Sequence, residues 1–409
     1  MAKAAVIWLS AAALLLVLPQ VVTAPSVITI LNQMAITIIF ALSYNMLLGQ
    51  AGMLSFGHAM FLGLGGFACI HVMNYAQAAG NALPLPLMPL IAGIFSMGVA
   101  LLVGALSVRR SGDVFAMISL GIVELVAAAA IILSVFFQGG GAGFDRTSAM
   151  QVMGVDFGRQ AEVYVLVIWW LMISVLVMWL FTRTPMGRMA CAVRDNPERA
   201  AFIGYAPGAV KLITFAFAGF FAGVAGGLFA VTYEIITVEN LGFEASGAIL
   251  MVAFLGGVGV FAGPILGAVV FTIAQTVMSL ETELWRLYLG VLFLACVMYF
   301  PSGLAGLITA HRDAWASGRS RLLASPYAAM AFSGGVCLLG LIGLAELINY
   351  SHGGLPGVDR LRLFWITWDD SDLIPWGIAV CMTIFGWILA RRQAPTFRAA
   401  QQAAGVTFS

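Results

Sequence analysis

The side chains that could carry out chemistry are few and scattered in this chain. Its 409 residues include five cysteines and four histidines, and no two cysteines have the spacing of metal ligands. The only lysines are Lys3 and Lys211, and neither follows the G-x-x-x-x-G loop that cradles a nucleotide phosphate. We therefore expect no catalytic residue, no metal site and no cofactor bound by this chain, and an enzymatic function has little support.

A second group of polar side chains lies inside apolar sequence. The stretch LLGQAGMLSFGHAMF (47–61) interrupts helical periodicity with three glycines and carries Gln50, Ser55 and His58. Broken helices often bind substrate in membrane transporters, although a buried structural turn has the same pattern. We predict a solute pathway that includes Asn45 and these three residues, with His58 hydrogen-bonded rather than catalytic.

Glu124 lies in the middle of another apolar stretch, SLGIVELVAAAA (119–130). A carboxylate at that depth in a membrane is costly unless it is paired, protonated or facing a cavity. We expect Glu124 to face the interior of the helix bundle. It is assigned to the same pathway, and a role in helix contact is equally compatible with its position.

The most informative polar segment is TRTPMGRMACAVRDNPERAAFIGYAPGAVKL (182–212). The residues Asp195 to Glu198 form a helix-start signal with an early proline, and Gly204 is a stop signal. We predict a short amphipathic helix here, flanked by Arg194 and Arg199. The segment is either an ordinary basic loop or a docking helix that presents a rigid knob to a soluble partner.

The elements that position these residues follow from composition. Hydrophobic residues make up 62% of the chain and charged residues 9%, against a soluble average of roughly 25% charged. The bilayer must therefore be the solvent, and the long continuous apolar runs favour helices. We predict an all-α, polytopic transmembrane bundle of about 10–12 spans. The expected spans are 4–22, 27–48, 58–76, 86–107, 114–137, 161–182, 209–232, 245–260, 262–280, 285–300, 326–349 and 373–390.

Charge distribution sets the expected orientation. With Arg109 and Arg110 placed in the cytoplasm, fourteen of the 19 Lys and Arg residues fall on the cytoplasmic side. Both termini and the basic loop then lie in the cytoplasm. The first apolar run could instead be a secretory signal cleaved near Ala24.

Two sets of glycines recur at four-residue steps and predict close helix packing. Small residues at this spacing share one helix face and let a second backbone approach. Static packing and a sliding surface during transport both fit the pattern. The sets are Gly219, Gly223 and Gly227, and Gly259, Gly263 and Gly267.

Several segments resemble a known family. ERAAFIG (198–204) is similar to the Glu-Ala-Ala…Gly coupling loop of bacterial ABC importer permeases, with Arg199 in place of the first alanine. Four further stretches resemble the LivM-type permeases of branched-chain amino acid importers, over about residues 25–310. They are ALSYNMLLGQAGMLSFGHAMFLGLGGF (41–67), GDVFAMISLGIVEL (112–125), FLGGVGVFAGPILGAVV (254–270) and FPSGLAGL (300–307).

The resemblance implies partners and a fold. It implies a type II importer permease with inverted repeats, which pairs with a second, LivH-like permease in the bacterial inner membrane. Two ABC ATPase subunits would hold ATP and Mg²⁺, and a periplasmic solute-binding protein would deliver the solute. Arg194, Asp195, Glu198, Arg199 and Gly204 would then couple this chain to an ATPase. We expect contact with membrane lipid and none with nucleic acid.

The resemblance leaves two points open. Residues 1–310 correspond to the permease core, whereas 311–409 form an extension with two additional spans that the family pattern does not explain. The solute could be a leucine-type amino acid, urea, an amide or an aromatic acid. An ion-driven secondary transporter is the alternative, but it would require several coupled intramembrane charges, of which Glu124 and Glu346 offer too few.

Overall fold

The fold was analysed in a computed structural model of the chain. Two compact units are present, Met1–Gly306 and Leu307–Ser409, and each is described by itself. This division lies close to the boundary expected between residues 310 and 311. The structure describes residues 15–404 except 16, 20–23, 80–83, 110–111, 139, 147–156, 301, 317–319, 352–360, 364–365 and 369–372.

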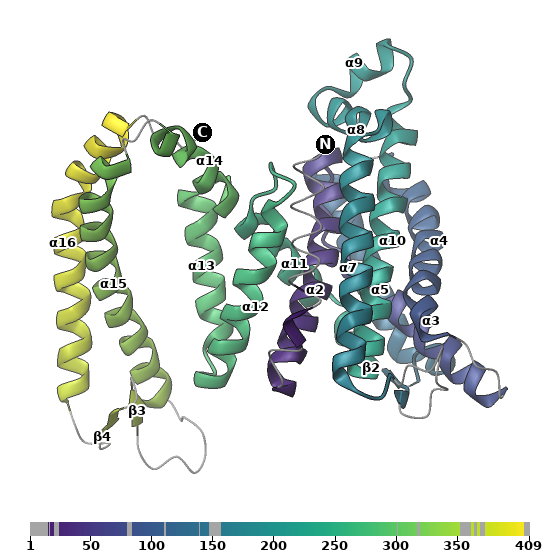
Figure 1. Ribbon diagram of the computed structural model, residues 1–409, viewed down its shortest axis with the longest axis horizontal. Helices are drawn as coiled ribbons and strands as arrows, with labels where there is room; N and C mark the ends of the chain where they lie inside the picture. The colour runs from purple at the N-terminus through teal and green to yellow at the C-terminus, as the bar shows by residue number, and fades with distance from the viewer. Residues whose placement is uncertain are drawn as a thin grey trace. The chain divides into compact units, whose positions relative to one another are not determined.

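The first unit is built almost entirely of helices, with one pair of short strands (Figure 1). Its helices are α2 (Pro25–Asn45), η1 (Met46–Gln50), α3 (Ala59–Ala78), η2 (Leu85–Leu87), α4 (Met88–Ser107), α5 (Asp113–Ile132), α6 (Ser134–Phe137), α7 (Gln160–Arg183), α8 (Pro185–Asp195), α9 (Pro197–Phe202), α10 (Pro207–Tyr233), η4 (Val238–Asn240), α11 (Phe243–Gly256), α12 (Gly263–Glu281) and α13 (Trp285–Tyr299), and its strands are β1 (Gly141–Gly143) and β2 (Ile235–Thr237). Helix α14 (Gly303–Ala316) begins in the first unit and ends in the second.

The all-α polytopic prediction is confirmed. Nine helices in the described part of the chain are long and apolar enough to cross a membrane, and a bent pair formed by α13 and α14 makes a tenth candidate. The apolar helix α11 has only 14 residues. The first predicted span, 4–22, falls largely outside the described residues. The predicted span 114–137 is divided at Leu133, where α5 ends and α6 begins.

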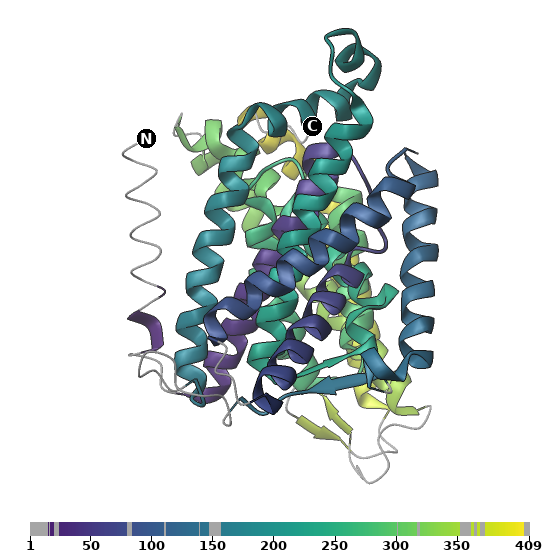
Figure 2. The same cartoon turned by 90° about the vertical axis from the view of Figure 1, so that its right-hand side faces the viewer.

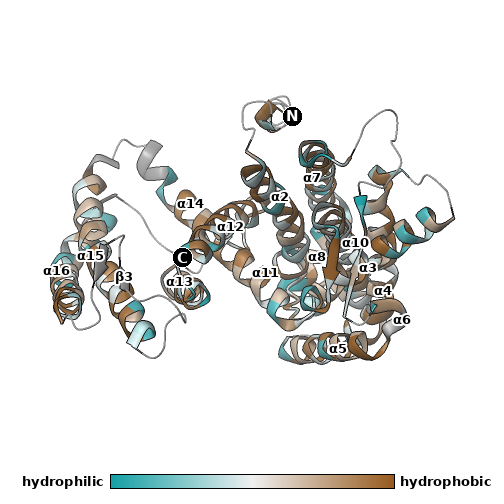
Figure 3. Cartoon of the chain, turned by 90° about the horizontal axis from the view of Figure 1, so that it is seen from below, coloured by the Kyte–Doolittle hydropathy of each residue, from teal (hydrophilic) through white to brown (hydrophobic). Residues whose placement is uncertain are grey.

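The core of the first unit lies around α2, α3 and α10. In each of these three helices more than half of the most apolar segment is buried. In α4 and α5 about two thirds or more of the corresponding segment is not buried. Figure 3 shows α5 at the periphery of this unit and built mainly of hydrophobic residues, several of which, including Met117, Leu125 and Ile131, are exposed. Since hydrophobic side chains are stable against lipid, this surface is compatible with a membrane environment.

The first glycine set lies along the α4–α10 contact. A Cβ at Gly219, Gly223 or Gly227 would overlap Ala100, Ser96 or Ala92, the small residues at matching steps on α4. The two helices can therefore approach closely because both faces are small.

The second glycine set does not form a ladder, which corrects the expectation of one shared helix face. Gly259 lies exposed in the turn between α11 and α12, with no atom near its Cβ position. Gly263 and Gly267 pack on the backbone of Gly257 and Val252. The spacing misleads because α11 ends at Gly256 and Gly257 has a φ of +104°, so the helix is interrupted before Gly259.

The two ends of the first unit carry different structures. At one end α7 leads into α8 and α9, which stand beyond the bundle in Figures 1 and 2. At the opposite end β1 and β2 pair antiparallel, with Gly141 opposite Thr237. The spans thus connect an all-helical end to an end closed by a small sheet.

The second unit is a long helical hairpin. Helices α15 (Ser320–Ser351) and α16 (Ile374–Ala404) run antiparallel, joined by a segment that contains strands β3 (Leu361–Leu363) and β4 (Ile366–Trp368). Gly340 packs against Thr383 and Gly386 against Cys337 along the hairpin. Both helices qualify as membrane spans, as the two extra spans predicted for this region require.

Candidate functional site: a broken helix, a cavity and a projecting loop

The glycine-rich stretch after α2 forms a buried break. Helix α2 widens into the π-helix η1, and Gly52, at a φ of +66°, turns the chain back toward the start of α3. The hydroxyl of Ser119 accepts a hydrogen bond from the Phe56 amide at 3.0 Å, and that of Ser246 accepts one from the Ala59 amide at 3.1 Å. Side chains of α5 and α11 therefore satisfy backbone groups that the broken helix leaves unpaired.

His58 is fully buried beside this break and is hydrogen-bonded. Its Nε2 lies 2.9 Å from the hydroxyl of Ser43, and its ring stacks on Phe40 with centroids 5.5 Å apart. Tyr44 and Phe61 approach the same ring edge-on. Among the described residues no acid or metal-ligating side chain joins it in a cluster. This environment is that of a packed histidine.

Helix α8 lies over the break. The guanidinium of Arg194 donates to the carbonyl of Gly49 and pairs with Asp195 at 2.9 Å. The thiol of Cys191 donates to the side-chain oxygen of Gln50 at 3.0 Å. Gln50, predicted to be in a pathway, is therefore engaged with α8.

Helix α9 projects from the bundle. Asn196 caps it by accepting the Arg199 amide at 2.8 Å, and Gly204 ends it with a φ of +92°. Glu198 and Arg199 are exposed on it. Three apolar side chains are also exposed here and were missed from the sequence: Phe202 is 90% exposed, Ile203 63% and Tyr205 42%. The predicted short helix is present, preceded by α8, which the sequence reading did not separate.

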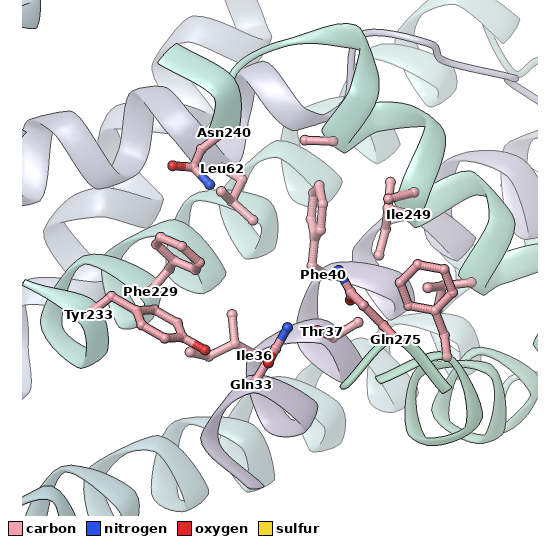
Figure 4. Close-up of a pocket in the computed structure, with 14 residues that line it drawn as sticks. Gln33, Ile36, Thr37, Phe40, Leu62, Phe229, Tyr233, Asn240, Ile249 and Gln275 are labelled. Atoms are coloured by element: carbon pink, nitrogen blue, oxygen red, sulfur yellow. The ribbon is translucent and has the colours of Figure 1, made fainter. Parts of the chain in front are cut away.

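A cavity of about 190 Å³ lies between α2, α10, α11 and α12 (Figure 4). It is mostly apolar, and its wall carries uncharged polar groups. The polar lining residues are Gln33, Thr37, Tyr233, Asn240 and Gln275, and the apolar ones include Ile36, Phe40, Leu62, Phe229, Ile249 and Phe271. No Asp, Glu, Lys or Arg is among the residues that line this cavity.

None of the five residues predicted for the pathway lines this cavity. Asn45, Ser55 and His58 are buried in the packing of the break. Phe40 connects the two regions, because it lines the cavity and stacks on His58. The signal in the sequence that could have indicated the cavity is the pair Gln33 and Gln275, two amides inside mainly apolar helices.

The position of Glu124 corrects the expectation that it faces the bundle interior. It is exposed on α5, between Val123, which is fully buried, and Leu125, which is 67% exposed. The inner face of α5 is occupied by Phe115, Ser119 and Val123. An apolar stretch shows where along a helix a carboxylate lies. The side of the helix on which it lies, facing the bundle or facing outward, depends on how the neighbouring helices pack.

At the opposite end of the unit a buried arginine fixes the glycine-rich loop that contains β1. Arg146 donates to the carbonyls of Val231 and Thr232 at 3.0 and 3.2 Å and pairs with Glu234 at 3.1 Å. With the β1–β2 pairing, these bonds attach the loop to the end of α10. The described part of the loop is therefore integrated into the fold.

These features define a polytopic helical membrane protein with a mostly apolar cavity and, in its described part, no cluster of His, Cys, Asp or Glu that could hold a metal ion. Residues 26–298 match the family of branched-chain amino acid transport system permease components. The chain belongs to this family. The match covers about the region over which the sequence resemblance was recognised.

Individual relatives agree with this assignment. The chain is 26% identical to the high-affinity branched-chain amino acid transport system permease protein LivM of Escherichia coli K12, over 66% of this chain and 67% of the relative. It is 28% identical to LivH of the same strain over 33% and 44%. It is 36% identical to the autoinducer 2 import system permease protein LsrC of Photorhabdus laumondii over 25% and 33%. No solved structure matches the chain.

Proposed function

We propose that this chain is the permease subunit of an ABC importer for branched-chain amino acids or related small solutes, in the bacterial inner membrane. Family membership and the relatives named for branched-chain amino acid transport support this function. The single observation that carries the ABC assignment is α9, a capped helix that projects from the bundle with Phe202 and Ile203 exposed. Exposed apolar groups on a projecting polar loop are typical of a protein interface.

The proposed ATPase contact is formed by α9, on the cytoplasmic side. Glu198 and Arg199 are exposed and supply charges at the rim, while Phe202 and Ile203 supply the apolar centre. Gly204 lets the chain leave the helix without covering that surface. The partner subunit would hold ATP and Mg²⁺, since this sequence has no phosphate-binding loop.

A second permease would cover α5. Glu124 is exposed at the twelfth position of a 20-residue span, and a carboxylate there is costly against lipid. A LivH-like partner would supply a polar group or an aqueous pathway beside it. Replacing Glu124 with Leu should weaken co-purification of the two permeases or transport, whereas unchanged assembly and transport would place α5 against lipid.

The solute would pass through the α2–α10–α11–α12 cavity. At about 190 Å³ it lies below the roughly 300–1,000 Å³ of sites for drug-sized ligands, so it suits a small solute. Its aliphatic and aromatic wall suits an apolar side chain. A periplasmic binding protein would deliver the solute at the end that carries β2, where Ile235 and Phe243 are exposed.

The test is solute-stimulated ATP hydrolysis by the complex purified through a tag on this chain. Wild type and Glu198→Arg are compared. Stimulated hydrolysis and recovery of the ATPase subunits should fall in the variant because charge is reversed at the interface. Unchanged hydrolysis, or the absence of any co-purifying ATPase, would refute the proposal and favour an ion-driven carrier.

A further inference from the structure

The broken end of α2 connects two regions with different proposed roles. The segment η1 is a π-helix, a rare conformation that occurs mostly as single turns and frequently at functional sites. On its N-terminal side, α2 contributes Gln33, Ile36, Thr37 and Phe40 to the cavity. Any displacement of η1 along the helix axis is therefore transmitted to one wall of the cavity.

Helix α8 contacts this π-helix through side chains from one of its faces. Arg194 donates to the Gly49 carbonyl, and Cys191, three residues earlier, donates to Gln50. The aliphatic part of Arg194 also covers Gly52, where a Cβ would lie 3.4 Å from the Cβ of Arg194. Because Gly52 has no side chain, α8 rests directly on the backbone of the break.

The environment of Arg194 differs from that of an arginine in a docking surface. Its side chain is 39% exposed, and its guanidinium is divided between Gly49 of the break and Asp195 of α8. Helix α9 begins two residues after Asp195, on the other side of Asn196. Arg194 thus lies between the projecting helix and the end of α2, and is oriented toward the latter.

We propose that Arg194 is a positioning residue that couples α8 to η1, so that movement of the projecting loop displaces α2 and reshapes the cavity. This inference rests on the proposed function. The coupling is mechanical: α8, η1 and α2 move as one body, and the Arg194–Gly49 contact keeps α8 attached to η1. The contribution of Arg194 is therefore to coupling and not to binding of the ATPase.

The first experiment compares Arg194→Ala with Arg188→Ala in the purified complex. Arg188 has the same side chain, lies on the same helix and is exposed, so it is the matched control. The Arg194 variant should retain its ATPase subunits but lose about tenfold in solute stimulation of hydrolysis and in transport, within the usual range of coupling between sites. The Arg188 variant should behave like wild type.

The second experiment replaces the contact by a covalent bond. The Cβ positions of residues 52 and 194 are 3.4 Å apart, close to the about 3.5–4.5 Å that a disulfide requires. The double variant Gly52→Cys with Arg194→Cys is prepared with the native cysteines replaced by serine or alanine. Two thiols are oxidised to one disulfide with copper phenanthroline and reduced again with dithiothreitol.

The reduced double variant should lose solute stimulation of ATP hydrolysis. If attachment of α8 to the break is what couples the loop to the cavity, the oxidised form should regain at least about half of the wild-type stimulation. Both forms carry the strain of a non-glycine residue at a φ of +66°, so the comparison between them is unaffected by it. Oxidised single variants control for other effects of the oxidant.

Two results would overturn the inference: wild-type coupling in Arg194→Ala, or no gain on oxidation of a double variant whose disulfide is verified by mass spectrometry. Either failure is distinguishable from failure of the proposed function. In the latter case the wild-type complex itself would show no solute-stimulated ATP hydrolysis.

Discussion

The helices α8 and α9 are separated by a single residue in the same basic loop, yet their side chains have opposite surroundings. On α8, Ala190 and Val193 are buried and Arg194 reaches the backbone of the broken helix. On α9, Ala200 is buried, whereas Phe202 and Ile203 contact little. One helix is anchored to the bundle and its neighbour presents an uncovered apolar surface.

Local sequence does not explain this difference. Both helices begin with proline at the first position after a capping side chain, which is Thr184 for α8 and Asn196 for α9. What differs is how each helix packs within the chain: α8 packs on η1, α7 and α10, whereas α9 packs on α8 and α10 and leaves Phe202 exposed. The comparison indicates that a capping side chain starts both helices. Tertiary contacts decide which helix is anchored to the bundle and which one leaves an apolar surface exposed.

The largest effect is expected when a charge replaces an apolar side chain on the exposed surface of α9. Phe202→Glu places a charge in the proposed interface, and loss of one buried Phe there costs about 1.5–3 kcal/mol before the charge is counted. Recovery of the ATPase subunits in co-purification should fall by at least about tenfold. Arg188→Glu, which places the same carboxylate on the exposed side of α8 and changes the charge by two units instead of one, should leave recovery close to wild type. Equal losses in the two variants would remove the distinction between the helices.

A smaller effect is expected at the end of α9. Gly204→Ala introduces a Cβ into open space but at a φ of +92°, so its cost is backbone strain of about 1–2 kcal/mol. Hydrogen exchange of the α9 amides should accelerate. Gly208→Ala is the matched control, since Gly208 is also exposed without nearby atoms and is not among the residues of positive φ. Equal exchange rates in both variants would show that α9 does not depend on this turn.

The smallest effect concerns the cap. Asn196→Ala removes the oxygen that accepts the Arg199 amide and should destabilise α9 by about 1 kcal/mol. Faster amide exchange in α9 with little change in α8 is the expected result. Asn196→Ser keeps a capping oxygen and should restore slow exchange. If Ala and Ser behave alike, the cap does not stabilise α9.

The spans were largely predictable because apolar length is a local property. The prediction of 161–182 corresponds to α7 at Gln160–Arg183, and that of 209–232 to α10 at Pro207–Tyr233. The start and stop of α9 also followed from local signals at Asn196 and Gly204. Helix α8 was missed because it has only 11 residues and its partner, η1, lies about 140 residues earlier in the chain.

The site was less predictable because it depends on how helices face one another. Glu124 lies near the middle of α5, but its orientation follows from which side of α5 packs on the break. Gly259 has the spacing of a ladder but lies in a turn. The cavity residues Gln33 and Gln275 come from helices α2 and α12, and nothing in either local sequence shows that they meet.

The most direct test of the ABC importer assignment is the energy source of transport. The complex, reconstituted into proteoliposomes with its solute-binding protein outside, is assayed for uptake of labelled leucine and related solutes. The account predicts that uptake requires ATP on the side where α9 projects, persists when ionophores abolish ion gradients, and fails in Phe202→Glu. Uptake driven by a proton or sodium gradient without ATP, and unaffected by Phe202→Glu, would contradict it.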